Sequence, residues 1–184
     1  MVHRFSSLDY VLFDYINQNA NKYVLLDHVM VGLSKYSPLA FVLILGFFLF
    51  LGSKNKKIVF QALLAAGLTV VISKSIQFFF YRDRPFISYD VNQLLEYTAN
   101  SSFPSDHTAC ALVIAVTIWF YRKQFGFLCI IAASGVAVSR IWIGVHFPFD
   151  VLAGIMLGGI IAFFVHYYVM QTRLIQSILH RLVH

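Results

Sequence analysis

Two short stretches of this sequence combine residue types that can handle a phosphate group. Residues 104–107 read Pro-Ser-Asp-His, and residues 139–150 contain Arg140, His146 and Asp150. The rest of the chain is mostly apolar, with 59% hydrophobic and 12% charged residues. Because ionisable groups are costly beside hydrocarbon, their presence next to apolar segments indicates a functional site.

The first stretch has the features of a helix start. Ser105 or Asp106 can cap the apolar helix that follows, and the unpaired N–H groups of its first turn attract an anion such as phosphate. His107 lies in that turn, where an imidazole with a pKa near neutrality can give or take a proton. A plain helix cap with a structural histidine is the alternative interpretation.

The second stretch places a histidine and an aspartate four residues apart. Pro148 suits the first turn of a helix, so Asp150 can hold one nitrogen of the His146 ring and leave the other free to attack. In this arrangement an orienting carboxylate prepares a nucleophile. A capping aspartate beside a structural histidine is the alternative.

Arginines complete the case for a phosphate site. Arg140 and Arg84 lie near the ends of apolar stretches, where a guanidinium requires an anionic partner. Such a pair, together with a helix start, can hold the phosphoryl oxygens and stabilise the charge that develops on them. A zinc site built on His107, His146 and Asp150 is the rival chemistry. We predict no metal, because the arginines would repel a dication and no HExxH motif or cysteine pair is present.

The elements that position these residues are predicted to be membrane helices. Crossing a bilayer takes about 20 mostly apolar residues, and backbone hydrogen bonding in lipid makes each such segment helical. The qualifying stretches are residues 34–52, 58–80, 105–121, 125–143 and 149–170. Pro38 and Gly52 are expected to mark the ends of the first stretch.

Ahead of these stretches, residues 8–32 alternate apolar and polar groups at near-helical spacing. This pattern predicts one or two amphipathic helices at the membrane interface, with a further short span as the alternative. We therefore expect an all-α, polytopic membrane helix bundle of five to six transmembrane helices with an N-terminal amphipathic helix. Residues 1–184 form a single integral-membrane domain with a core at 25–170.

Charge predicts the orientation of this bundle. The basic residues of the connections after the first, third and fifth spans share one side, and short basic loops stay cytoplasmic. They are Lys54, Lys56, Lys57, Arg122, Lys123, Arg173 and Arg181. All eight acidic residues fall on the outer side with both candidate histidines and both candidate arginines. The net charge of +6 therefore indicates a positive inner face rather than a nucleic-acid partner.

Residues 86–104 join the second and third spans on the outer side and form the longest polar stretch between spans. Connections of this length without obvious secondary structure are often lids or binding loops. A disordered connector is the alternative.

The order and spacing of these residues resemble the type 2 phosphatidic acid phosphatase superfamily of membrane phosphatases. Its motifs are Lys-x6-Arg-Pro, then Pro-Ser-Gly-His, then Ser-Arg-x5-His-x3-Asp. The third motif is complete here over residues 139–150, and Arg84-Pro85 represents the first. The second has Asp106 where most members have glycine. The resemblance covers roughly residues 25–170.

The resemblance implies a role for each residue. His146 would be the nucleophile and form a phosphohistidine, Asp150 would orient it, and His107 would protonate the leaving group. The phosphoryl oxygens would be held by Arg84, Arg140 and the region of Ser105. The family chemistry needs no metal or other cofactor.

The first two motifs depart from the family pattern. Seven residues before Arg84 stands Gln77 instead of lysine. Lys74 lies one turn deeper on the same helical face and can extend its long stem to the site, and Arg82 is a third candidate for this role. Asp106 could contact a second phosphate through a cation, bond a neighbouring arginine or cap the helix. We favour the last two.

The Pro-Ser-Asp-His variant, the small size and the amphipathic start are most similar to the bacitracin-resistance subgroup of bacterial undecaprenyl-diphosphate phosphatases. That similarity implies a polyprenyl diphosphate substrate and a multi-pass protein of the bacterial plasma membrane, in contact with membrane lipids, with its active site on the outer face. Phosphatidate, phosphatidylglycerol phosphate and diacylglycerol diphosphate are alternative substrates. A lipid-phosphate transporter is the non-enzyme alternative, disfavoured by the few spans and the lack of an inverted repeat.

Overall fold

The computed structural model describes residues 2–52 and 55–183, and this part of the chain contains helices and no strands. The helices, in chain order, are α1 (Val2–Asn17), α2 (Val24–Phe50), α3 (Lys56–Phe79), α4 (Pro85–Ser88), α5 (Asp106–Tyr121), α6 (Lys123–Trp142), α7 (Pro148–Tyr167), the 3-10 turn η2 (Val169–Gln171) and α8 (Arg173–Val183). The all-α class is confirmed.

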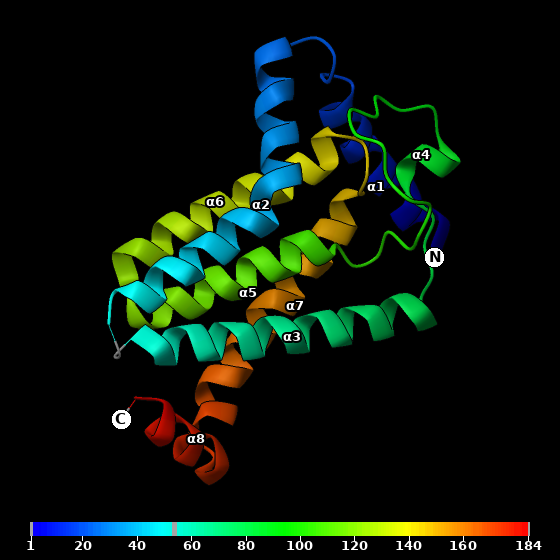
Figure 1. Ribbon diagram of the computed structural model, residues 1–184. Helices are drawn as coiled ribbons and strands as arrows, with labels where there is room; N and C mark the ends of the chain where they lie inside the picture. Colours follow the sequence, from blue (N-terminus) through cyan, green and yellow to red (C-terminus); the bar gives the residue numbers. More distant parts are fainter. Residues whose placement is uncertain (1, 53–54, 184) are drawn as a thin grey trace.

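Helices α2, α3, α5, α6 and α7 form the bundle seen in Figure 1. Helix α5 is central, since it packs against each of the other four. The four helices around it are long and apolar enough to cross a membrane, and α5 is a shorter apolar helix of 16 residues. These five helices match the five predicted spans, so the chain is a multi-pass membrane protein.

Helix α2 corrects the predicted start of the first span. It begins at Val24 rather than near residue 34, and Pro38 lies inside it. Proline removes one backbone hydrogen bond of a helix and bends it, which does not require the helix to end. Figure 1 shows α2 changing direction partway along its length. Gly52 does follow the end of the helix and has a φ of +104°, a conformation that glycine adopts without strain.

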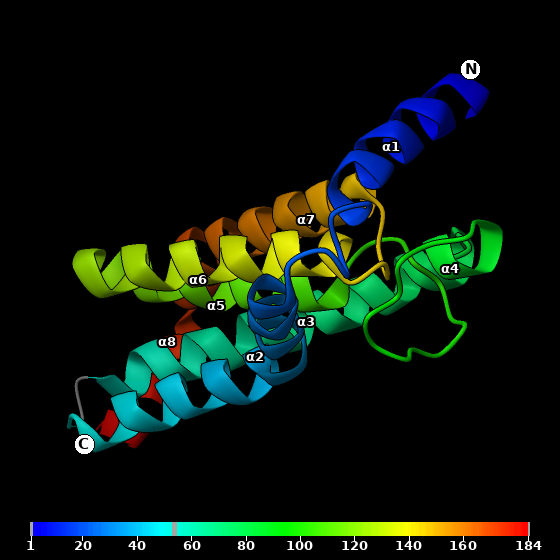
Figure 2. The same ribbon diagram turned by 90° about the horizontal axis from the view of Figure 1, so that it is seen from above.

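Helix α1 is the expected N-terminal amphipathic helix, but its buried face is partly polar. Asp9, Phe13 and Asn17 recur every four residues and are buried against α6 and α7. The opposite face exposes its apolar side chains, namely Leu8, Val11, Leu12 and Tyr15. Figure 2 shows α1 projecting from one end of the bundle. An exposed apolar face at that place suits the membrane interface.

The two predicted groups of charges lie at opposite ends of the bundle. Helices α3 and α6 end, and α5 and α7 begin, at the end that the loop of residues 89–105 covers (Figures 1 and 2). The opposite end carries Lys56, Lys57, Arg122 and Lys123, while Lys54 lies outside the described residues. The helix ends that bear the candidate site residues therefore come together.

Close packing of α5 on α7 brings the second and third motifs into register. A side chain at Gly158 would place its Cβ 2.5 Å from the carbonyl oxygen of Ala109, and one at Gly154 would lie 2.8 Å from that of Ser105. The backbone N–H of Ser105 also donates to the carbonyl oxygen of Asp150 at 3.0 Å. Only glycine allows the two helix starts to approach this closely.

Candidate active site

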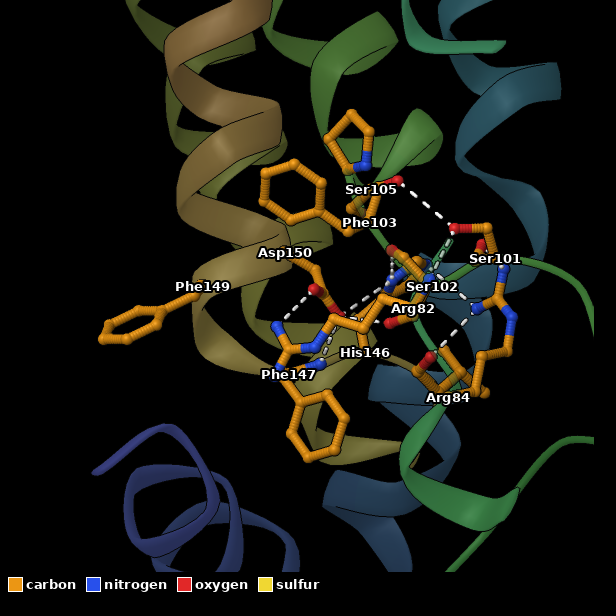
Figure 3. Close-up of polar contacts among 12 residues, drawn as sticks. Arg82, Arg84, Ser101, Ser102, Phe103, Ser105, His146, Phe147, Phe149 and Asp150 are labelled. Carbon is orange, nitrogen blue, oxygen red and sulfur yellow. Dashed lines mark hydrogen bonds and ion pairs between the residues drawn. The ribbon is translucent and has the colours of Figure 1, made fainter. Parts of the chain in front are cut away.

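His146 lies in the turn between α6 and α7, with 2% of its surface exposed. Its Nδ1 is 2.8 Å from the carbonyl oxygen of Ser102. Because a carbonyl only accepts, we assign the ring proton to Nδ1, which leaves a lone pair on Nε2. Arg84 Nη1 donates to Nε2 at 3.1 Å. Figure 3 shows this imidazole between Ser102 and Arg84.

The electrostatic surroundings keep His146 neutral. Burial lowers the pKa of the ring from 6.5 to about 4, and the positive charges of Arg140 and Arg84 act in the same direction. A neutral imidazole keeps a lone pair on Nε2, which accepts the Arg84 hydrogen bond here. This form can attack a phosphorus atom once a phosphoryl group takes over that donor.

Asp150 acts on His146 differently from the sequence expectation. We expected the carboxylate to bond the ring directly, but its Oδ2 lies 3.7 Å from Nδ1, which is longer than a hydrogen bond. Instead Asp150 accepts hydrogen bonds from the Ser102 hydroxyl and, at 2.8 Å, from the backbone N–H of Phe147. Ser102 therefore links the two groups, because its hydroxyl binds Asp150 and its carbonyl binds His146.

Arg82 is paired with two carboxylates on the far side of Asp150. Its Nη1 lies 2.7 Å from Asp150 Oδ1, and its Nη2 lies 2.6 Å from Asp9 Oδ2. Asp9 is fully buried, and its Oδ1 accepts the backbone N–H of Phe149 at 2.9 Å. Burial raises the pKa of Asp9, while its bonds to Arg82 and Phe149 oppose that rise. Arg82 is thus committed to structure and does not take the place of the first-motif lysine.

Arg84 is buried and clamped by the 89–105 loop. Its Nε and Nη2 donate to Asn100 Oδ1 at 3.0 and 2.7 Å, and Nη1 also donates to the carbonyl oxygen of Val145 at 2.9 Å. The guanidinium therefore connects this loop to the turn that carries His146. Its burial lowers its pKa from the ordinary value for arginine.

Arg140, in the last turn of α6, is fully buried. Its Nη1 donates to the Ser34 hydroxyl of α2, whereas Nε and Nη2 have no hydrogen-bond partner in the described part of the chain. Its own carbonyl accepts the N–H groups of Val145 and His146 at 3.2 Å. One turn therefore holds both the arginine and the imidazole. Buried donors without a partner are costly, so their presence indicates a site for an anion.

His107 lies in the first turn of α5, where Arg140, His146 and Arg84 all act on it electrostatically. Its ring has no hydrogen-bond partner among the described residues, which leaves both nitrogens available to a substrate. Ser105 occupies the N-cap position of the same helix. Its hydroxyl contacts the Thr108 hydroxyl at 3.1 Å rather than a backbone N–H, so the first-turn N–H groups stay open to an anion.

The favoured interpretations of Asp106 are wrong. Its carboxylate neither bonds an arginine nor caps α5, but accepts hydrogen bonds from α3. The donors are Lys74 Nζ at 2.6 Å, Gln77 Nε2 at 2.8 Å and the Ser73 hydroxyl. Lys74 also donates to Gln77 Oε1 at 2.9 Å. The substituted aspartate of the second motif is therefore neutralised by the displaced lysine of the first.

The 89–105 loop forms a wall of the site, which agrees with a binding loop and not with a disordered connector. The N–H of Ser102 donates to the carbonyl oxygen of Arg82 at 2.8 Å. The N–H of Leu94 donates to the carbonyl oxygen of Ile143 at 3.3 Å. Sequence reasoning gave no role in the site to Asn100 or Ser102 of this loop, nor to Asp9. The signals for them were the polar run at residues 100–102, directly ahead of the second motif, and an acidic residue in line with Phe13 and Asn17.

The converging helix ends of an all-helical, multi-pass bundle enclose this site. Such a fold and such a site define the class of membrane lipid phosphatases. The chain belongs to the PAP2 superfamily, whose family model matches residues 58–174. The resemblance drawn from the three motifs is confirmed.

Individual relatives extend over most of the chain. "Undecaprenyl-diphosphatase BcrC" of Bacillus subtilis (strain 168) is 33% identical over 157 residues, which are 85% of this chain and 81% of that protein. "Bacitracin transport permease protein BcrC" of Bacillus licheniformis is 35% identical over 165 residues, which are 88% of this chain and 80% of that protein.

Solved structures share the fold. Aquifex aeolicus LpxE superimposes with a TM-score of 0.78 at 32% identity, covering 88% of this chain and 96% of that one. The PAP2 type phosphatidylglycerolphosphate phosphatase of Bacillus subtilis has a TM-score of 0.72 at 24% identity, covering 92% and 89%. At that identity the second likeness shows the fold alone.

Proposed function

We propose that this protein is an undecaprenyl-diphosphate phosphatase that releases the terminal phosphate and leaves undecaprenyl phosphate, with His146 as the nucleophile. The observation that carries the proposal is the buried, neutral imidazole whose Nε2 meets a buried guanidinium at 3.1 Å, beside a second guanidinium with unpaired donors. Relatives that cover most of the chain support the substrate, because one bears the name undecaprenyl-diphosphatase.

In the first step, Nε2 of His146 attacks the terminal phosphorus, and the bond from phosphorus to the bridging oxygen breaks. His107 gives a proton to the departing oxygen, which leaves as undecaprenyl phosphate. Arg84, Arg140 and the N–H groups of the α5 start hold the phosphoryl oxygens. The Nδ1–H remains on the Ser102 carbonyl, and Asp150, 3.7 Å away, stabilises the positive charge that develops on the ring.

In the second step, a water molecule attacks the phosphohistidine. His107, now neutral, takes a proton from this water as the phosphorus–nitrogen bond breaks. Inorganic phosphate leaves, and both histidines return to their starting protonation states. No step requires a metal ion, and the metal-free mechanism stays a prediction.

An apolar cavity beside His107 supports a lipid leaving group. It has a volume of about 270 Å³ and lies between α2 and α5. Its lining residues are Ser37, Pro38, Phe41, Val42, Asp106, His107, Cys110, Ala111 and Ile114. In an in-line displacement the leaving group departs opposite the nucleophile, on the side of the general acid. A polyprenyl chain attached to that group would therefore enter this cavity.

The proposed location is the outer face of the bacterial plasma membrane. Support comes from the charge distribution, because the end of the bundle opposite the site carries Lys56, Lys57, Arg122 and Lys123. Short basic connections stay on the cytoplasmic side. A cysteine introduced in place of exposed Ala99 or exposed Gln124 should distinguish the faces, since only the former should react with an impermeant thiol reagent in intact cells.

The function is tested by phosphate release from undecaprenyl diphosphate by the purified protein in detergent. We expect turnover that survives a chelator and falls by about 10⁴-fold or more in His146→Ala. His28→Ala is the matched control, because His28 is exposed on α2 and its Nδ1 bonds only its own helix, at the Val24 carbonyl. Retained turnover in His146→Ala would remove the proposed nucleophile.

A substrate panel separates the remaining possibilities. Phosphatidate, phosphatidylglycerol phosphate and diacylglycerol diphosphate are compared with undecaprenyl diphosphate by kcat/KM. A preference of about tenfold or more for a glycerolipid would reverse the assignment. The name of the Bacillus licheniformis relative describes transport, and the absence of any phosphate release would favour a transport function.

A further inference from the structure

Tyr97, in the 89–105 loop, lies among the groups proposed to bind phosphate. Arg84 Cζ lies over its ring at 4.5 Å from the centroid, and Arg140 Cζ lies over it at 4.9 Å. The centroid of the His107 ring is 6.4 Å away. Both guanidinium groups are therefore within cation–π range of a single ring.

The two arginines need such a partner because no carboxylate of the described residues forms an ion pair with either of them. Arg84 bonds Asn100, His146 and backbone carbonyls, and Arg140 bonds Ser34. Within the described ranges, neither forms an ion pair. Like charges repel strongly in a poorly hydrated interior. The electron-rich face of an aromatic ring offsets this repulsion without a negative charge that would compete with a phosphoryl group.

The Tyr97 ring and a phosphoryl group can contact the same arginines at the same time. A guanidinium has a planar face that stacks on aromatic rings and an edge of N–H donors that binds oxygen. The Cζ atoms of Arg84 and Arg140 both lie over the Tyr97 ring. The Nε and Nη2 donors of Arg140 have no partner within the described residues and stay open to phosphoryl oxygens. The contact with the ring thus leaves these two donors without a partner in the part of the chain that the structure describes.

The loop is fastened on both sides of this tyrosine. Before it, the N–H of Leu94 donates to the Ile143 carbonyl at 3.3 Å, and after it Asn100 binds Arg84. Leu94, Leu95 and Tyr97 also pack against the cluster formed by Ala20, Trp142, Ile143 and Val145. The position of the ring is thus set by the fold.

We propose that Tyr97 is a positioning residue that holds Arg84 and Arg140 side by side at the phosphoryl site through the face of its ring. The inference rests on the proposed phosphatase function and extends it to a residue outside the three motifs. It assigns the role to the aromatic ring, although the Tyr97 hydroxyl group also interacts with Arg140, and the Tyr97→Phe variant separates the two contributions.

The test compares Tyr97→Leu with Tyr97→Phe in steady-state kinetics, with inorganic phosphate as a competitive inhibitor. Tyr97→Leu should raise both KM and the inhibition constant of phosphate about tenfold, with a smaller change in kcat. Tyr97→Phe keeps the ring and should stay within about threefold of the parent in both constants. Tyr89→Leu is the matched control, since Tyr89 leads into the same loop but stacks on Tyr10, at 4.2 Å between centroids, rather than on an arginine.

Two results would overturn the proposal. One is a Tyr97→Leu enzyme with parental KM and phosphate inhibition, and the other is a Tyr97→Phe enzyme as impaired as Tyr97→Leu. If thermal unfolding shows that Tyr97→Leu does not fold, Tyr97→Trp replaces it. A loss of phosphate inhibition in both Tyr97→Trp and Tyr97→Phe would then exclude a role for the ring.

Failure of this inference differs from failure of the proposed function. A parent protein that releases no phosphate, or an active His146→Ala variant, contradicts the phosphatase itself. An active parent and an inactive His146→Ala variant, together with an unaffected Tyr97→Leu variant, contradict only the role of the tyrosine.

Discussion

The arginines in and around the site fall into two groups that differ in charge balance. The Arg82 network consists of Asp9, Arg82, Ser102 and Asp150. It sets one cation against two carboxylates, and each of the two Nη atoms of Arg82 pairs with one of them. The Arg84–Arg140 pair has two cations without an ion-paired carboxylate in the described part of the chain. The first group is complete without a ligand, whereas the second is completed by an anion.

This contrast separates scaffold from site. Removing a member of a compensated network leaves a buried charge without its partner and destabilises the fold. Removing an uncompensated cation relieves a desolvation cost and affects chiefly the binding of the anion. Arginine variants should therefore divide into those that lose stability and those that lose activity.

The largest expected effect is on activity, in Arg140→Gln. Loss of the charged donors that face the phosphoryl oxygens should lower kcat/KM by about 10³-fold, since such groups act on charge that develops in the transition state. The unfolding temperature in detergent should not fall, because the removed cation has unpaired Nε and Nη2 groups. Arg140→Lys restores the charge without the planar fork and should recover only part of the activity. An unstable but catalytically normal Arg140→Gln protein would contradict the division.

The next effect is on stability, in Arg82→Gln. This change leaves Asp9 and Asp150 buried without their shared cation and should lower the free energy of unfolding by about 3–5 kcal/mol. Asp9→Asn removes only one arm of the network and should cost less. Thermal or denaturant unfolding in detergent measures both.

Arg122→Gln is the matched control for this prediction. Arg122 lies at the opposite end of the bundle, where it donates to Asn55 Oδ1 at 3.2 Å and pairs with no carboxylate among the described residues. Its replacement should leave stability nearly unchanged. Equal losses of stability in Arg82→Gln and Arg122→Gln would show that the Arg82 network stabilises the fold no more than the contact of Arg122 does.

The smallest effect concerns pH. The neutral form of His146 is the nucleophile, so activity is lost as the pH falls through its pKa. Because burial and the Arg84–Arg140 pair lower that pKa to about 4, this loss should occur well below the ordinary value of 6.5. Nitrogen-15 NMR of histidine-labelled protein, assigned with His146→Gln, should show a neutral His146 ring at pH 5.5, between these values. A ring that titrates near 6.5 would mean that neither burial nor the arginines lower its pKa.

Much of this architecture was predictable because a bilayer leaves a chain few choices. Apolar stretches of sufficient length must be helical, so five spans could be placed to within a few residues at most of their ends. The exception was α2, because a proline can bend a membrane helix as well as end one. The motif residues were also identifiable, since their spacing and their setting in an apolar chain point to one phosphate chemistry.

The partners of those residues were not predictable. Asp9 meets Arg82 across 73 residues, and Asp106 meets Lys74 across 32. Such contacts depend on how α1 rests on α6 and α7 and how α3 rests on α5. Each of these residues also has an ordinary interpretation on its own helix, which is why Asp106 was expected to act as a cap.

The sequence by itself determined the helical class, the multi-pass character and the identity of the reactive groups, because hydropathy and residue chemistry are local properties. Only the tertiary structure decided that the carbonyl of Ser102, rather than Asp150, accepts the hydrogen bond from Nδ1–H of His146, and that one tyrosine contacts two arginines. The physical reason is that hydrogen bonds and cation–π contacts depend on distances of a few ångströms, which helix packing sets and residue spacing along the chain does not.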